Sequence, residues 1–520
     1  MGVSVMGLLG VCTQLRAIEP DPYPIEVGVI QRFGEELKDE MVITTPNDEP
    51  LTLTFEENGE SQTLQTDRLT LEIETVPLNQ PKVRERVILS DHATFETAET
   101  SAKTWEALGL KAEVTQPGRW QVWADPDVYH SPLLRRLLLE SLRDDGYETP
   151  YIETEVLEEL VTASFVLSGK RYTPDNLEIR HPEKRIYVDG SDAPRRLYPG
   201  ELRLQPNSYG NYTLVNIVPV EAYLRGVVPH EIGPNAPLEA VKAQAIIART
   251  YALRNLHRFE ADDYEICANT HCQVYWGLSD TNQRTDRAIE ATAKQVLTYE
   301  NELVDALYSS TTGGVTAFFS DIWDGGQRPY LRSVVDSTYG AWDLEKRPLN
   351  QEENFRAFIN QQQGFNETGS RAFRWRRESS IEQLSEDLNQ YLKRINHPDA
   401  DKVTEIQEMK VTARSRSGRI LEMEVETEKG VITLEKTEVR SAFGPPRSTL
   451  FYIDPVLKSN GQLQGYRFIG GGFGHGVGLS QIGAHHLAKQ GWSAPEILSF
   501  YYPDTEIIPL SVLVTKTSSP

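Results

Sequence analysis

The chain has 520 residues, a formal net charge of −23 at pH 7, and 39% apolar and 25% charged residues. This composition is typical of a soluble globular protein, and the length favours two or three domains. The negative charge argues against nucleic acid and anionic lipid as partners, because both require clustered Lys and Arg, and a neutral glycan fits better.

The first residues, 1–17, contain a short apolar stretch that is signal-peptide-like but has no basic n-region. A leader, a truncated leader and a late start codon all remain open. No apolar run approaches the roughly 18 residues that a membrane helix needs. From Ile25 onward, period-two alternation of Thr, Val and Ile predicts half-exposed antiparallel strands in a β-rich region, 18–95.

A different pattern covers residues 96–150. A helix is predicted from Ala102 to Leu108, a strand from Trp120 to Trp123, and an apolar helix from Pro132 to Leu142. The segments RWQVWADP and LLRRLLLESLRDDGY resemble a SPOR-type module, a small fold whose known examples bind peptide-free glycan. The alternative is a structural subdomain in which both tryptophans are simply buried.

Further strands are predicted at 164–167, 177–179, 186–188 and 212–218, before a helical part begins. Residues 346–404 are polar and contain an amphipathic helix from Ile381 to Ile395. Strands follow at 408–411, 420–425 and 430–434. Strands, then helices, then strands predict an α+β fold, with antiparallel strands flanking a central, mostly helical catalytic region and a small inserted αβ subdomain.

Glu231 is the candidate acid. It lies between Val227-Val228-Pro229 and Ile232, and such apolar neighbours desolvate a carboxyl group and raise its pKa. A glycosidic oxygen is a poor leaving group unless it is protonated, so a glycan-cleaving enzyme needs such an acid. By itself, a single Glu beside a turn is an ordinary residue.

A helix is predicted from Leu238 to Leu256, with Pro237 at its first position and Asn235 near its cap. Lys242 and Arg249 are seven residues apart and therefore share one side of this helix. They are either solvated or directed into a cleft, where the bidentate guanidinium suits a carboxylate.

Cys267, His271 and Cys272 form a compact cluster. Two thiolates and an imidazole suit tetrahedral zinc, although no fourth ligand is identifiable. The alternatives are two buried cysteines or a disulfide that closes a short loop. A zinc ion here would be structural and would brace the loop that presents Gln273 and Tyr275.

Seven glycines surround His475 and Gln481 between Gly470 and Gly483, and they permit close backbone approach. No Gly-Lys-Ser/Thr follows, so this is not a phosphate loop. Upstream, Tyr308-Ser-Ser-Thr-Thr-Gly-Gly and Asp321-Ile-Trp323 supply aromatic side chains that could stack on a sugar ring.

Together, VPVEAYLRGVVPHE (ending at Glu231), the Cys/His cluster and FGHGVGLSQIGAHHLAKQGW make the chain similar to the SpoIID/LytB-domain family over about 160–340 and 405–510. That family is built around lytic transglycosylases, which cut peptide-free peptidoglycan strands between MurNAc and GlcNAc and leave 1,6-anhydroMurNAc ends. The resemblance implies that Glu231 is the acid and base, with Arg249 and Lys242 as electrostatic positioning residues. It implies substrate contacts from Gln273, Tyr275, Tyr308, Trp323, His475 and Gln481.

The resemblance also divides the chain into a first core part at 155–345, an insertion at 346–404, a second core part at 405–510 and a tail at 511–520. It implies export to the periplasm or cell envelope, structural zinc in some members, and no organic cofactor. Expected partners are glycan strands and a cell-wall amidase. Two alternatives remain: a non-catalytic, LytB-like activator of such an amidase, and a zinc amidase.

Overall fold

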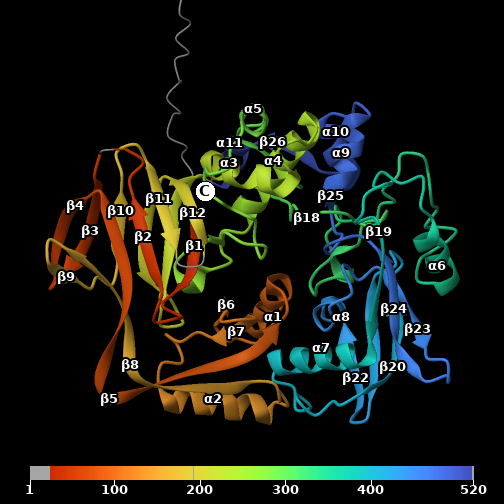
Figure 1. Ribbon diagram of the computed structural model, residues 1–520, viewed down its shortest axis with the longest axis horizontal. Coiled ribbons are helices and arrows are strands. Elements are labelled where there is room, and N and C mark those ends of the chain that lie inside the picture. The colour runs from red at the N-terminus through yellow and green to blue at the C-terminus, as the bar shows by residue number, and fades with distance from the viewer. Residues whose placement is uncertain (1–23, 48, 191–192, 518–520) are drawn as a thin grey trace, which may run out of the picture.

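The computed structural model describes residues 24–47, 49–190 and 193–517, so the leader-like segment and Cys12 lie outside the described residues. The fold is of the mixed α+β class (Figure 1). The N-terminal sheets lie on the left of the view, a group of helices at the top, and the C-terminal sheets on the right. No helix among the described residues is long and apolar enough to cross a membrane.

The predicted N-terminal strands are present and belong to two sheets, in which β1 also pairs in parallel with β15. The first sheet contains β1 (Pro24–Phe33), β3 (Leu51–Glu57), β4 (Glu60–Thr66), β10 (Leu177–Arg180), β13 (Glu201–Pro206), β14 (Tyr212–Pro219) and β15 (Ile266–Cys267). The second contains β2 (Glu40–Thr44), β5 (Arg68–His92), β6 (Ala112–Thr115), β7 (Trp120–Ala124), β8 (Tyr151–Leu167), β9 (Lys170–Tyr172), β11 (Arg185–Gly190) and β12 (Ala193–Pro199). Alternating side chains of both sheets share one core.

The far ends of β5 and β8 belong to a small βαββαβ unit, which also contains α1 (Phe95–Ala107) and α2 (Pro132–Asp144). Its strands lie in the order β6-β7-β5-β8, and every neighbouring pair is antiparallel. This is the split βαβ arrangement. Trp120 and Trp123 are both buried in it.

The helical centre is built from α3 (Val220–Ile232), α4 (Leu238–Arg254), α5 (Gln283–Ala291), α9 (Gln481–Lys489) and α10 (Ala494–Tyr501). The predicted helix after Asn235 is confirmed as α4, although Pro237 is its N-cap and it ends at Arg254. Its many alanines leave α4 buried on nearly every side, which suits its contacts with the other four helices. Around it lie β16 (Gln295–Tyr299), β17 (Glu302–Leu303), β18 (Tyr308–Ser309), β25 (Leu479–Ser480), β26 (Glu506–Pro509), α11 (Leu510–Thr517), η1 (Glu260–Asp262) and η2 (Phe319–Asp321).

The polar segment 346–404 and the strands after it form one body rather than an insertion beside them. Side chains from Trp375 to Leu392 share a hydrophobic core with residues from Val403 to Phe468. The elements are α6 (Glu352–Asn360), β19 (Arg374–Ser380), α7 (Ile381–Arg394), β20 (Ile406–Arg414), β21 (Ile420–Thr427), β22 (Gly430–Glu435), α8 (Thr437–Ser441), β23 (Phe451–Leu457) and β24 (Leu463–Gly471).

One buried carboxylate from this body, Glu367, binds the segment 312–314 and Ser480, the N-cap residue of α9. It accepts hydrogen bonds from the backbone amides of Gly313 at 2.8 Å and Gly314 at 3.0 Å. It also accepts from the Thr312 amide and hydroxyl, and from the Ser480 hydroxyl at 2.6 Å. A fully buried carboxylate is tolerated only when its oxygens are satisfied in this way.

We expect Glu367→Ala to lower the free energy of unfolding by about 3 kcal/mol or more, because it leaves several buried donors without an acceptor. Urea denaturation of the purified protein measures this loss. Glu353→Ala, at an exposed position of α6, is the matched control and should change stability little. Equal stability of the two variants would contradict the role assigned to Glu367.

Candidate functional site

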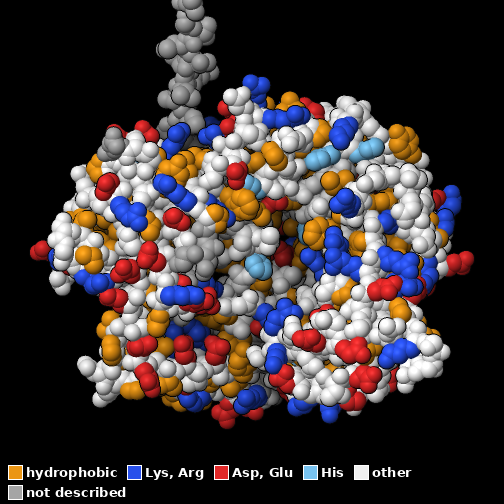
Figure 2. Space-filling model, in the orientation of Figure 1, with side chains coloured by type: hydrophobic (Ala, Val, Ile, Leu, Met, Phe, Trp, Pro, Cys, Tyr) orange, Lys and Arg blue, Asp and Glu red, His pale blue; other side chains and the backbone are white. Residues whose placement is uncertain are grey.

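A cavity of about 740 Å³ opens where the helical centre, the βαββαβ unit and the C-terminal body meet. The face drawn in Figure 2 is hollowed near its middle, in the same region. The cavity is lined by residues 93–96, Trp120, Glu231, Tyr251, Arg258, 270–272, Val274, 307–310, Trp323, Thr437, Arg440, Ser441, 473–475 and Gln481. These residues come from segments that are far apart in the sequence, so only the folded chain assembles the site.

Glu231 lies in the last turn of α3 and reaches the cavity. Its Oε1 accepts a hydrogen bond of 2.9 Å from the backbone amide of Val274. Burial raises the pKa of this carboxyl group, while that amide, the Tyr308 side chain and the Gln481 side chain act in the opposite direction. The effect of burial is the larger one, so the pKa of Glu231 is raised and its carboxyl group keeps the proton to a higher pH than in water, as the sequence predicts.

A close approach between a helix and a loop makes the Val274 contact possible. The backbone amide of Trp276 donates to the Gly226 carbonyl at 3.2 Å, which lays residues 274–277 along α3. A Cβ at Gly226 would stand 2.2 Å from the Gly277 carbonyl oxygen and 2.7 Å from the Tyr275 ring. Only glycine fits there, and the packing that it allows brings the Val274 amide to Glu231.

Tyr308 and Gln481 reach Glu231 through a short pair of parallel strands, β18 and β25. Leu479 donates its amide to the Leu307 carbonyl at 3.1 Å, and this pairing sets the two segments side by side. Behind them, the Gln273 side chain donates to the Tyr308 hydroxyl at 3.1 Å and accepts from Tyr223 at 3.2 Å. Gln273 is fully buried, so it supports Tyr308 instead of lining the cavity.

His475 and Trp323 lie together at the cavity wall, with ring centroids 5.0 Å apart. Burial, followed by the positive charge of the nearby Arg440, lowers the pKa of His475 to about 3, although a hydrogen bond with the Tyr308 backbone acts in the opposite direction. The imidazole is therefore neutral near pH 7. Phe473 also lines the cavity and is 43% exposed, which leaves more of its ring open than the nearly buried Trp323 does.

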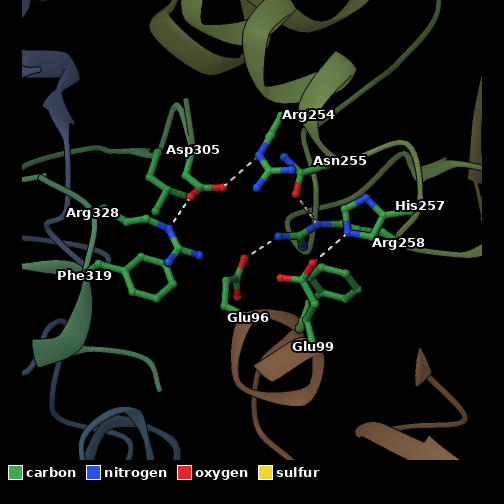
Figure 3. A pocket seen from close by; sticks show the side chains of 11 residues that line it. Glu96, Glu99, Arg254, Asn255, His257, Arg258, Asp305, Phe319 and Arg328 are labelled. Carbon is green, nitrogen blue, oxygen red and sulfur yellow. Dashed lines mark hydrogen bonds and ion pairs between the residues drawn. The ribbon is translucent and has the colours of Figure 1, made fainter. Parts of the chain in front are cut away.

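The second carboxylate at the cavity, Glu96 of α1, is engaged in an ion pair. Figure 3 shows it facing Arg258, beside a pair formed by His257 and Glu99 at 3.0 Å. These contacts fasten α1 to the segment that follows α4, and the Thr100 hydroxyl also donates a hydrogen bond of 3.0 Å to the Asp324 carbonyl oxygen. The βαββαβ unit thus forms a fixed wall of the cavity.

Two expected positioning residues do not line the cavity. Arg249 is fully buried and binds Glu221 in a bidentate pair, at 2.8 Å and 2.7 Å. Lys242 pairs with Glu239 at 2.7 Å, and both side chains are half-buried. The seven-residue spacing does place both on one side of α4, but that side faces Glu221 and solvent instead of Glu231.

Tyr275, an expected substrate contact, is also fully buried and donates to the Asn216 side chain at 2.8 Å. Of the six predicted substrate contacts, the cavity therefore contains Tyr308, Trp323, His475 and Gln481. Tyr275 and Gln273 fail to line it because their loop turns its side chains onto α3 and presents a backbone amide to the site.

At the Cys/His cluster the structure has a disulfide, which was one of the alternatives to a zinc site. Cys267 and Cys272 are joined by a disulfide, while the His271 side chain is exposed and borders the cavity. Bonded sulfurs are not thiolate ligands, and the described residues contain no group of three or more His, Cys, Asp or Glu able to hold a metal. The expected zinc ligands do not fit zinc in this form, and zinc in the reduced protein stays a prediction.

Several cavity residues have no sequence signal of their own. Arg440 and Glu96 are charged residues in ordinary polar surroundings, and the Val274 contact is made by the backbone, which no side-chain pattern reveals. Phe473 is part of the glycine-rich motif, but the sequence does not reveal that its ring is exposed.

Two family models match parts of the chain. Residues 208–299, which include Glu231 and the disulfide, match the family model described as "Stage II sporulation protein" (SpoIID). Residues 317–478 match "Domain of unknown function (DUF8618)". Residues 208–299 are thus a SpoIID domain, and the chain is similar to the SpoIID/LytB family.

Its curated relatives are similar over more than half of the chain. Stage II sporulation protein D of Bacillus subtilis is 27% identical over 318 residues, 58% of this chain and 78% of that protein. The amidase enhancer of Bacillus subtilis is 30% identical over 302 residues, 55% of this chain but only 40% of that protein. An uncharacterized protein of Brachyspira hyodysenteriae is 26% identical over 317 residues, 60% of this chain and 72% of that protein.

The raised pKa of Glu231 predicts a pH-dependent penalty on stability. Above the ordinary glutamate pKa of 4.5, the unfolded chain loses this proton before the folded chain does, so the folded state loses stability as pH rises through that interval. We expect Glu231→Gln to melt at a higher temperature than the unsubstituted protein at pH 8, with the difference disappearing below pH 4.5. Glu302→Gln, at an exposed position, should show no such trend. A lower melting temperature for Glu231→Gln at every pH would contradict the assigned desolvation.

The disulfide determines how many free thiols the protein should have before and after reduction. The sequence has three cysteines, so the unreduced, unfolded chain should have one reactive thiol, at Cys12, and three after reduction. Titration with a thiol reagent in denaturant measures this, with Cys12→Ser as the control that removes the single thiol. Three thiols and stoichiometric zinc, measured by atomic emission in the protein as purified, would instead restore the zinc site.

Proposed function

We propose that the chain is a peptidoglycan lytic transglycosylase, which cleaves peptide-free strands between MurNAc and GlcNAc and leaves 1,6-anhydroMurNAc ends. The observation that carries the proposal is the environment of Glu231: one carboxyl group with a raised pKa, in a cavity of about 740 Å³ with aromatic side chains at its wall. A raised pKa keeps the carboxyl group protonated to a higher pH than an ordinary glutamate, and glycosidic cleavage requires such a proton donor.

The number of available carboxylates favours this reaction over ordinary hydrolysis. Glycoside hydrolases normally use a pair of carboxylates that flank the scissile bond. Among the described residues that line the cavity, the only carboxylates are Glu231 and Glu96, and Glu96 is engaged with Arg258. A mechanism with a single acid suits this arrangement, because the nucleophile is then the substrate's own hydroxyl group.

In the proposed reaction, Glu231 donates its proton to the glycosidic oxygen as the bond from that oxygen to C1 of MurNAc breaks. The carboxylate left behind accepts the proton of the C6 hydroxyl of the same MurNAc while the C6 oxygen bonds to C1. No water is consumed and the acid is regenerated. The Val274 amide, Tyr308 and Gln481 favour the intermediate carboxylate, since each lowers the Glu231 pKa.

The proposal has further parts. Trp323 and Phe473 would provide faces on which sugar rings stack. The βαββαβ unit would contribute glycan contacts in the manner of a SPOR-type module, a view supported by its topology and by Trp120 at the cavity. Export to the cell envelope would bring the chain to its substrate and would also suit the disulfide.

A second candidate is a non-catalytic glycan-binding activator of a cell-wall amidase. It is favoured by the similarity to a protein named amidase enhancer, although the matched region is less than half of that protein. An activator needs the cavity to bind glycan but has no use for a desolvated acid, so the Glu231 substitution separates the two functions.

We expect the purified protein to release anhydromuramyl ends from glycan strands pre-stripped by an amidase, and none from intact sacculi. Glu231→Gln should lower the release rate by at least about 100-fold, because it removes the general acid. Mass spectrometry of the released ends measures the product, and Glu302→Gln is the exposed control with unchanged activity. Sedimentation with the strands and no release, by the unsubstituted protein, would favour the activator.

A further inference from the structure

The cavity contains one cation without a protein partner. Among the described residues that line it, the permanently charged cations are Arg258 and Arg440. Arg258 donates to Glu96 and to the His271 carbonyl oxygen. Arg440 forms neither an ion pair nor a side-chain hydrogen bond with the described residues, and it is exposed to the cavity.

The short helix α8 fixes where Arg440 lies. Before it, the Lys436 ammonium donates to the Trp323 carbonyl oxygen at 3.3 Å and pairs with Asp324. At its end, Arg394 donates to the Ser441 carbonyl oxygen at 2.8 Å. Val439 is fully buried in the C-terminal core. With both ends tied and one neighbour buried, α8 presents Arg440 at the cavity wall.

Arg440 belongs to the same site as Glu231. Its charge lowers the pKa of His475, which is hydrogen-bonded to the Tyr308 backbone, and Tyr308 in turn lowers the pKa of Glu231. The surrounding protein lowers the pKa of Arg440 by desolvation, and no carboxylate compensates. The guanidinium stays charged, because its ordinary pKa is above 12. A partly desolvated, unpaired cation favours an anionic ligand.

We propose that Arg440 binds the lactyl carboxylate of muramic acid and thereby selects strands from which the peptide has been removed. In an intact strand the lactyl carbonyl is tied up in the amide bond to the peptide and has no charge. Hydrolysis of that amide frees a carboxylate, which a guanidinium binds with two parallel hydrogen bonds. This inference rests on the proposed function for its glycan substrate.

The experiment compares two ligands that differ only in this charge: amidase-stripped strands, and the same strands after carbodiimide coupling to ammonia, which converts the carboxylates to neutral amides. Binding is measured by titration calorimetry in the Glu231→Gln background, so cleavage does not interfere. We expect amidation to weaken binding about tenfold, with a smaller difference at high salt. Arg440→Gln should lose this preference, while Arg440→Lys should keep part of it.

Arg284→Gln is the matched control, since it removes an exposed cation on α5 and should retain the full preference. Equal binding of the two ligands by the parent protein, or an unchanged preference in Arg440→Gln, would overturn the assignment. Binding is measured without cleavage, so the two proposals can fail separately. If binding prefers the free carboxylate and the preference depends on Arg440, but the protein releases no anhydromuramyl ends, the carboxylate site is upheld and only the transglycosylase activity is refuted. If the protein cleaves amidated and unmodified strands at the same rate, the transglycosylase activity is upheld and the carboxylate site is refuted.

Discussion

The site depends on keeping a carboxyl group desolvated without a cation beside it. Glu231 lies in the last turn of α3, where the helix carbonyls contribute partial negative charge and disfavour a carboxylate. Its polar partners are neutral: the Val274 amide, Tyr308 and Gln481. An arginine in contact would lower the Glu231 pKa and remove the proton on which acid catalysis depends. The bidentate pair of Arg249 with Glu221 therefore has a consequence for chemistry, because it holds this buried cation of α4 on Glu221 instead of on the acid.

The same pair also braces the scaffold. Arg249 of α4 binds Glu221 at the start of α3 and donates to the Gln295 carbonyl oxygen at 3.0 Å, which joins two helices to the start of β16. A buried pair of this kind is costly to break from one side, because the remaining charge loses its partner. Loss of activity in an Arg249 variant would thus report on the support of α3, and it would not by itself identify a substrate contact.

Local patterns predicted the elements well, and contacts between distant segments account for what was missed. Period-two alternation correctly indicated β1 and β3, the further strands predicted at 177–179 and 212–218 are present as β10 and β14, and the alanine-rich stretch indicated α4, since these signals reside in neighbouring residues. The desolvation of Glu231 was also predicted from its neighbours. The direction in which the Arg249 side chain points was not predicted. Helical spacing shows that Lys242 and Arg249 lie on one side of the helix, but it does not show which group that side faces. Arg440 and Glu96 reach the cavity through tertiary packing alone, and the choice between a zinc site and a disulfide depends on the redox state of two sulfurs as much as on spacing.

The arrangement of charge in the cavity separates proton transfer from anion binding. Glu231 is the group with a raised pKa, and Arg440 is the cation without a protein partner. His475 stands between them in the chain of interactions, and its pKa of about 3 keeps it neutral near pH 7. It therefore neither competes with Glu231 as a proton donor nor neutralises an anion bound at Arg440. Because Arg440 and Glu231 line the same cavity, a ligand held at Arg440 would also be positioned relative to Glu231, and recognition of the free carboxylate would act on cleavage as well as on binding.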